Sequence, residues 1–243
     1  MSNIDFELVL KSVVSLPMVR IDRRAFLKSE LIKYCPKDQV LDAIENNPAH
    51  AGIPVSVINK IADSCINFET NKVSAISFAS GLPGGLAMFG TVPADLAQYS
   101  GHILRILQKL IYLYGWEELI PEDGRLDDET NNMLTLFVGV MFGANGAATT
   151  ITKVSAGAAQ QASKKLASKA LTKGMIYPIV KKVSQAIGVK MTKEIFAKGV
   201  SKVIPIVGGV VSGGITYVTY KPMAYKLKRY LGTLKWCNVS YYK

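Results

Sequence analysis

The chain has few of the residues that form catalytic or metal sites. Its 243 residues include three cysteines, Cys35, Cys65 and Cys237, and two histidines, His50 and His102. Three widely spaced cysteines match neither a disulfide framework nor a zinc pattern, and two histidines are too few for a Cys/His metal cage. We therefore expect no metal and no cofactor, and a protein of a reducing compartment.

Recognised catalytic motifs are also missing, and so are several kinds of targeting and linker sequence. The N-terminal sequence lacks the basic start, the apolar run and the small-residue cleavage site of a secretory signal, which predicts a cytosolic protein. The chain shows no repeat of fixed period and no low-complexity linker. Its length fits one large domain or two small ones, and we predict a single domain over residues 1–243.

Acidic residues almost disappear from the C-terminal part of the chain. Residues 1–152 contain 12 Lys and Arg against 17 Asp and Glu, whereas residues 153–243 contain 17 against one, Glu194. The two parts therefore carry net charges of −5 and +16, which together give the +11 of the whole chain. The acidic segment 117–130 precedes the change and is a candidate boundary between two halves. A part this basic predicts an anionic surface as its partner.

Uncharged sequence is abundant. Hydrophobic residues make up 49% of the chain and the mean hydropathy is +0.21, although 19% of residues are charged, a mixture that fits a protein that meets a membrane without being dissolved in it. There are three long uncharged runs, at residues 73–94, 131–152 and 203–220. In the second and third runs, small residues recur four positions apart, which allows helices to approach closely. These residues are Gly139 and Gly143, and Gly209 and Gly213.

Apolar residues recur at helical spacing through most of the chain. The first predicted helices cover residues 4–16, 21–34, 38–46 and 55–68. The first uncharged run is long enough to cross a bilayer as one helix, but Gly81, Pro83 and Gly84 interrupt it. The sequence thus predicts an all-α, compact multi-helix bundle with glycine-rich apolar helices and a helical hairpin around the GLPGG break. The hairpin either packs in a soluble core or dips into lipid.

The helix that begins at Pro93 carries a row of polar residues. Spacings of three and four place these residues above one another: Asp95, Gln98, His102, Arg105, Lys109 and Tyr112. A solvated helix face explains such a row, and so does a strip that binds phosphate headgroups. Asp95 lies where a carboxylate caps a helix N-terminus. With His102 it also forms a candidate acid/base pair, but no nucleophile or metal set joins them.

The basic half, residues 153–243, is rich in amphipathic helical patterns. Such helices lie on anionic bilayers, and we expect six lysines to contribute most to docking: Lys164, Lys165, Lys169, Lys173, Lys181 and Lys182. The C-terminal tail interleaves Lys and Arg with aromatic residues. That pattern suits RNA stacking as well as anchoring at a headgroup layer, but the adjoining apolar runs favour lipid. We therefore expect no specific nucleic acid partner.

Two blocks of the sequence resemble the EcsC family of bacterial proteins. The first runs from Gly81 to Trp116 (GLPGGLAMFGTVPADLAQ continuing into HILRILQKLIYLYGW), and the second, KVIPIVGGVVSGGITYVTYKPMAYKLKR, from Lys202 to Arg229. The order of helices between them is also similar, and the resemblance implies a membrane-associated helical protein. Some sequences of this kind are labelled bacteriochlorophyll vinyl reductase. The glycines of the first block lack the strand–turn–helix context and the later acidic residue of a dinucleotide fingerprint, so they do not support that activity.

Together these patterns favour a peripheral membrane protein on the inner face of the cell membrane. It would dock on anionic bilayers through the basic half, hold acyl or isoprenoid chains, and could pair with a membrane protein or oligomerise on the membrane. Two alternatives stay open. One is a membrane-perturbing effector that inserts its glycine-spaced helices, and the other is an enzyme that modifies a lipid or isoprenoid.

Overall fold

The structure is a computed structural model of the whole chain. It describes residues 6–16, 18–80, 94–160, 178, 180–186, 188 and 205–243, with the backbone alone for residues 74–80, 94–96, 156–160 and 205–216. Within these ranges the regular structure is entirely helical and no strand occurs, which confirms the all-α class.

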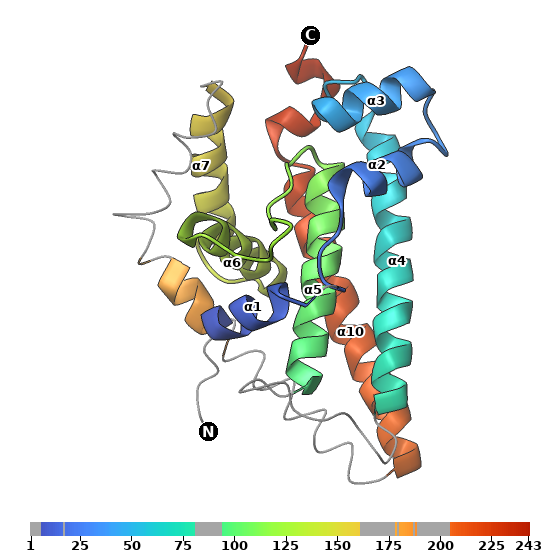
Figure 1. Cartoon of the computed structure of the whole chain (residues 1–243), viewed down its shortest axis with the longest axis vertical. Helices are drawn as coiled ribbons and strands as arrows, with labels where there is room; N and C mark the ends of the chain where they lie inside the picture. Colours follow the sequence, from blue (N-terminus) through green and yellow to red (C-terminus); the bar gives the residue numbers. More distant parts are fainter. Residues whose placement is uncertain are drawn as a thin grey trace.

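The helices follow one another in a simple order. They are α1 (Phe6–Val14), α2 (Arg23–Leu31), α3 (Lys37–Glu45), α4 (Val55–Ser80), α5 (Ala94–Leu113), α6 (Asp128–Phe142), α7 (Ala147–Gln160) and α10 (Pro205–Leu231), and then the 3-10 turns η1 (Lys235–Cys237) and η2 (Val239–Tyr241). The long helices α4, α5 and α10 run side by side, with α5 and α10 antiparallel to α4 (Figure 1). Helix α6 crosses these helices, and α7 packs against α6. Helices α2 and α3 lie together at one end of the bundle.

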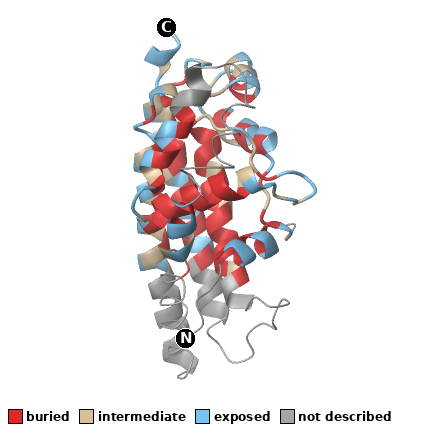
Figure 2. Cartoon of the chain, turned by 90° about the vertical axis from the view of Figure 1, so that its left-hand side faces the viewer, coloured by how far each residue is buried: buried red, intermediate tan, exposed pale blue. Residues whose placement is uncertain are grey.

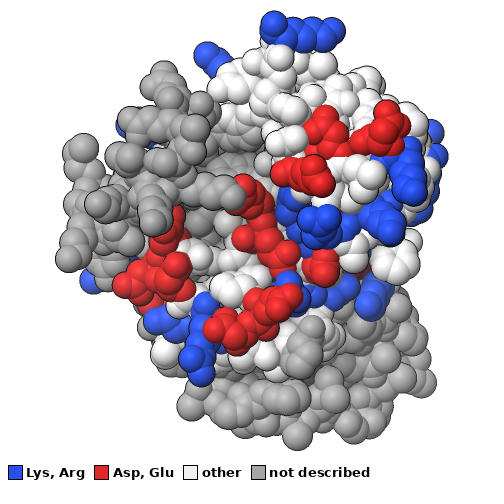
Figure 3. Space-filling model, turned by 45° about the horizontal axis from the view of Figure 1, so that its top comes forward, with Lys and Arg blue, Asp and Glu red and all other residues white. Residues whose placement is uncertain are grey.

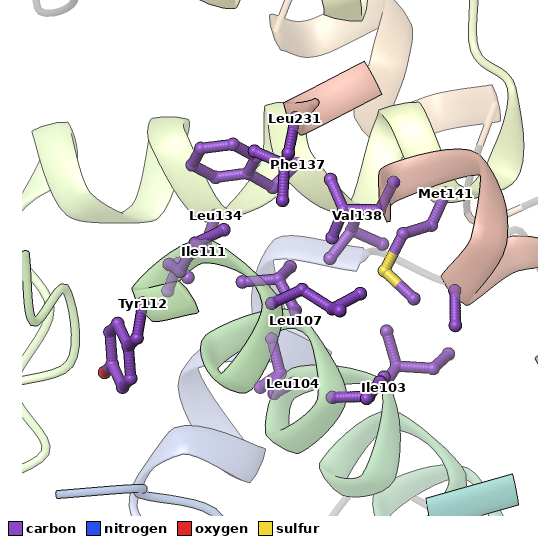
Figure 4. Packing of buried hydrophobic residues seen from close by; sticks show 14 of the residues in the cluster. Ile103, Leu104, Leu107, Ile111, Tyr112, Leu134, Phe137, Val138, Met141 and Leu231 are labelled. Atoms are coloured by element: carbon purple, nitrogen blue, oxygen red, sulfur yellow. The ribbon is translucent and has the colours of Figure 1, made fainter. Parts of the chain in front are cut away.

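Helix α5 is the centre of the core. Most of its described side chains are buried, as expected for a helix that is covered on all sides. Figure 2 shows that buried residues gather in the interior of the bundle. Figure 4 shows how side chains from α5, α6 and α10 meet there: Ile103, Leu104, Leu107, Ile111, Leu134, Phe137, Val138, Met141 and Leu231. One hydrophobic cluster extends from Phe6 to Cys237, so both halves of the chain contribute to the same core.

The acidic segment 117–130 does not separate two cores. Its Glu118 binds the Arg20 guanidinium at 2.6 Å, which ties the segment to the connection between α1 and α2. The C-terminal tail also returns to the N-terminal half, where the Asn47 amide donates to the Tyr242 hydroxyl at 2.8 Å. The candidate boundary is therefore a surface connection within one packed body.

Helix α4 is longer than the sequence predicted. The predicted helix ended at Phe68, before the first uncharged run, but α4 continues without interruption to Ser80. Glu69, Thr70 and Val73 are buried and extend the helix face that packs on the neighbouring helices, so nothing in the packing ends the helix at Phe68. The GLPGG break itself lies outside the described residues, between α4 and α5.

The second uncharged run is not one helix. Gly143 takes a left-handed conformation with φ 68° at the C-terminus of α6, and Gly146 has φ 87° before α7 begins. Gly139 and Gly143 therefore do not share a helix face, and Gly143 is a helix terminator. Gly139 does lie where α6 closely approaches the helical segment 180–186, because a Cβ at position 139 would be 2.4 Å from Val183 Cγ1. In the part of the chain that is described, no helix has the length and hydropathy needed to span a membrane.

A buried arginine holds the end of the bundle where α2 and α3 lie. The Arg23 Nε donates to the carbonyl of Trp116 at 2.9 Å, while Nη1 and Nη2 donate to the carbonyls of Ile44 at 2.6 Å and Asn46 at 3.2 Å. These carbonyls lie at or just past the ends of α3 and α5, where backbone acceptors have no partner within the helix. Burial lowers the pKa of Arg23, but the ordinary pKa of a guanidinium is so high that the group keeps its charge at neutral pH.

We expect Arg23→Lys to lower the free energy of unfolding by about 2 kcal/mol, because one ammonium cannot reach three carbonyls that the planar guanidinium serves together. The neighbouring Arg24 is exposed, so Arg24→Lys is the matched control and should leave stability unchanged. Urea unfolding of the two variants measures both effects. Equal stabilities for the two variants would contradict the role given to Arg23.

Candidate functional site

The polar row on α5 does not form an exposed strip. His102 and Tyr112 are buried, Gln98 is half-buried, and the side chains of Arg105 and Lys109 are largely covered by neighbouring helices. For its described members the row is therefore a packing face of the core, and the role of these residues in binding headgroups stays a prediction. The side chain of Asp95 lies outside the described residues.

Three members of the row converge on a carboxylate from another helix. Glu69 of α4 is fully buried, and its Oε1 accepts a hydrogen bond from the Lys109 Nζ at 2.7 Å. The Nη2 of Arg105 lies 3.9 Å from the same oxygen, and the Nδ1 of His102 lies 3.9 Å from Glu69 Oε2. We call Glu69, His102, Arg105 and Lys109 the buried charged cluster.

Groups from three other parts of the chain contact the buried charged cluster. The Tyr220 hydroxyl of α10 donates to the backbone carbonyl of His102 at 3.0 Å, and Arg105 donates to the carbonyl of Met18 in the connection between α1 and α2. The Lys109 ammonium lies 5.7 Å from the centre of the Phe26 ring, close enough for a cation–π contact. The cluster thus joins α4, α5 and α10 with the N-terminal part of the bundle.

The charges of the cluster determine its chemistry. Burial by itself raises the pKa of Glu69, but the contacts with His102, Lys109 and Arg105 lower it by more, to about 2. Glu69 is therefore ionised throughout the physiological range. A general acid or base works best with a pKa near the working pH, so this carboxylate is better suited to binding helices together than to transferring protons.

Sequence reasoning missed Glu69, although the sequence contains a signal for it. Apolar residues at helical spacing mark the buried face of α4: Ile58, Ile61, Ala62, Cys65, Ile66 and Val73. Glu69 occupies the same face, three residues after Ile66 and four after Cys65. A carboxylate on an apolar helix face requires a buried cation, and the row on α5 supplies one.

The predicted docking lysines fall into two groups. Lys164, Lys165, Lys169 and Lys173 lie outside the described residues. Lys181 and Lys182 are exposed in the helical segment 180–186, whose Val180 and Val183 are buried. This segment therefore turns its two lysines outward while its valines pack on the protein.

Two other described cations of the basic half differ in exposure, since Lys226 is exposed and the side chain of Lys228 is largely covered. Lys228 pairs with Asp63 of α4 at 2.6 Å, and the Lys226 ammonium lies near Gly143, at the C-terminal end of α6. Acidic and basic side chains interleave on the face that Figure 3 shows. Gly209 and Gly213 belong to α10, in the part where the backbone alone is described.

No described set of side chains is a metal site. Among the residues that the structure describes, no three His, Cys, Asp or Glu side chains come close enough to hold an ion. His102 faces Glu69 across the helix interface, which is a different partner from the Asp95 that the sequence suggested for an acid/base pair.

We expect Glu69→Gln to destabilise the protein by roughly 3 kcal/mol at neutral pH, because the change removes an ionised carboxylate whose pKa is depressed to about 2 from 4.5. A carboxylate whose pKa is depressed by folding stabilises the folded protein at pH values above its pKa in the unfolded chain. This stabilisation is lost as the pH falls through the pKa of the folded protein. The difference between wild type and Glu69→Gln should thus shrink between pH 4.5 and about pH 2.

Urea unfolding at a series of pH values measures this difference. Glu45→Gln is the control, since Glu45 is exposed on α3 and its loss should leave stability unchanged. If wild type and Glu69→Gln kept the same stability difference down to pH 2, the ion pair would not be the stabilising contact.

Comparison of the chain with protein-family models, with curated proteins and with solved structures finds no match in any of the three. The resemblance to the EcsC family therefore stays a prediction from the two sequence blocks. In the first block the described residues begin at Ala94, and in the second at Pro205. No family is assigned on this basis.

Proposed function

We propose that this protein is a peripheral membrane protein that docks on anionic bilayers through its basic C-terminal half. The observation that carries the proposal is the absence of acids from the described residues of the C-terminal half. Where the structure describes residues 147–243, they include no Asp or Glu. The described cations there are Lys153, Lys181, Lys182, Lys221, Lys226, Lys228, Arg229, Lys235 and Lys243.

The free energy that these cations would contribute on an anionic bilayer is large enough for binding. A Lys or Arg near an anionic leaflet contributes about 1 kcal/mol, and this contribution fades within a Debye length of roughly 10 Å at moderate salt. Several cations together therefore give reversible binding that depends on both salt and lipid charge. The only ion pair described for these cations uses Asp63, which leaves most of them free to meet headgroups.

Exposed aromatic residues of the basic half favour lipid over nucleic acid. Tyr217 is exposed on α10, and Tyr241 and Tyr242 are exposed at the C-terminal end. Amphipathic rings of this kind settle at the level of lipid headgroups. The cavity beside Ser100, between α1, α5 and α6, has room for little more than a water molecule, so this cavity does not hold an acyl or isoprenoid chain.

We expect the protein to co-sediment with vesicles that contain phosphatidylcholine and phosphatidylserine, and to stay in solution with vesicles of phosphatidylcholine alone. The bound fraction should fall steeply as salt is raised, because the attraction is electrostatic.

An oligoribonucleotide added in excess provides the comparison with a nucleic acid partner. Equal binding to both kinds of vesicle without salt dependence would contradict the proposal. So would strong binding to the RNA by a protein that ignores anionic vesicles.

A further inference from the structure

The outer surface of α10 differs from its inner surface in a regular way. The inner side chains Tyr220, Met223, Ala224, Leu227 and Leu231 are buried, and α10 packs most extensively on α4, with further contacts to α6 and α5. The remaining side chains between positions 217 and 229 are exposed or partly exposed and, Thr219 apart, lie over about half of the helix circumference. They are Tyr217, Val218, Lys221, Pro222, Tyr225, Lys226, Lys228 and Arg229, which we call the α10 face.

Lysines and tyrosines are paired along the α10 face. The Lys221 Nζ donates to the Tyr217 hydroxyl at 3.0 Å and lies 5.1 Å from the centre of the same ring. About two turns further on, the Lys228 Nζ lies 5.7 Å from the centre of the Tyr225 ring. Each pair places an ammonium and an amphipathic ring at the same height, which is the combination that suits the headgroup layer.

Apolar side chains complete the α10 face. Val218 is 69% exposed and Tyr217 is 42% exposed, with no described residue covering them. Such exposure is unfavourable in water, but small and isolated enough to keep the protein soluble. Val218 and Pro222, one turn apart, could enter the boundary between headgroups and acyl chains while the cations beside them stay among the phosphates.

Charge complementarity identifies the partner. The described ion pair on the α10 face is the one between Lys228 and Asp63, so Lys221, Lys226 and Arg229 remain available to anions. We infer that the α10 face is the surface that lies on the bilayer, with the helix parallel to the membrane plane and an anionic phospholipid headgroup as the ligand. This inference rests on the proposed function and adds the orientation of the protein on the membrane.

Charge removal at matched sites tests the orientation. The α10 variant Lys221→Gln/Lys226→Gln/Arg229→Gln loses three cations from the α10 face, and the control Arg24→Gln/Lys28→Gln/Lys37→Gln loses three exposed cations from α2 and α3. On phosphatidylserine vesicles we expect the α10 variant to bind at least about tenfold more weakly than wild type, and the control to bind within about twofold. Unchanged thermal unfolding shows that both variants fold.

A third variant separates the α10 face from the rest of the basic half. Lys153→Gln/Lys181→Gln/Lys182→Gln removes three exposed cations from α7 and the segment 180–186. Strong loss of binding in this variant alone, with the α10 variant binding like wild type, overturns the orientation and leaves the proposed function standing. If wild type does not distinguish anionic from neutral vesicles, the proposed function fails as well.

An environment-sensitive fluorophore measures burial in the headgroup layer directly. Val218→Cys in a Cys35→Ser background can be labelled selectively, because burial raises the pKa of the Cys65 thiol to about 11 and of the Cys237 thiol to about 12. A label at position 218 should shift its emission to the blue on anionic vesicles, whereas a label at Ser29→Cys on α2 should not. The same shift at both positions, or at position 29 alone, overturns the orientation.

Discussion

The arrangement of the long helices depends on one buried carboxylate. Glu69 is fully enclosed and ionised, and it needs the Lys109 ammonium 2.7 Å away to offset the loss of water. Only one register of α4 against α5 brings these two groups together. The Tyr220 hydroxyl then fixes α10 against the carbonyl of His102 in the same layer. A buried ion pair adds little net stability over apolar packing, so its value here lies in specifying how the three helices meet.

This fixed arrangement determines what α10 presents to its surroundings. With Tyr220, Ala224 and Leu227 turned inward, the other side of the helix must carry Lys221, Lys226 and Arg229 outward. Acids of the N-terminal half form ion pairs with cations of the same half, such as Glu69 with Lys109 and Glu118 with Arg20. The cations of α10 therefore carry the charge asymmetry of the chain to the surface. The proposed docking on anionic lipid follows from cations for which the described residues give no ion pair.

Periodicity predicted the helical class and most helix positions because apolar spacing reflects burial directly. It did not predict that α4 continues past Phe68, because the burial of Glu69, Thr70 and Val73 depends on helices that are distant in the chain. The polar row on α5 was difficult for the same reason. Residue spacing places His102, Arg105 and Lys109 on one helix face, but it does not show whether that face contacts water or the Glu69 side chain. That information depends on contacts between residues far apart in the chain. Gly143 was misread for a related reason, because a four-residue spacing does not distinguish a packing glycine from a left-handed helix end.

The central claim is that the protein meets the bilayer as a folded body, through its basic surface, with the core intact. Photolabelling from a phospholipid with a reactive group on its acyl chain tests this most directly, with the labelled residues identified by mass spectrometry. The account predicts labels on Tyr217, Val218 and their neighbours on the α10 face, and none on the buried residues of α5 and α6, such as Leu107 and Phe137. Labels on Leu107 or Phe137 would mean that the bundle opens and inserts, and would contradict the account.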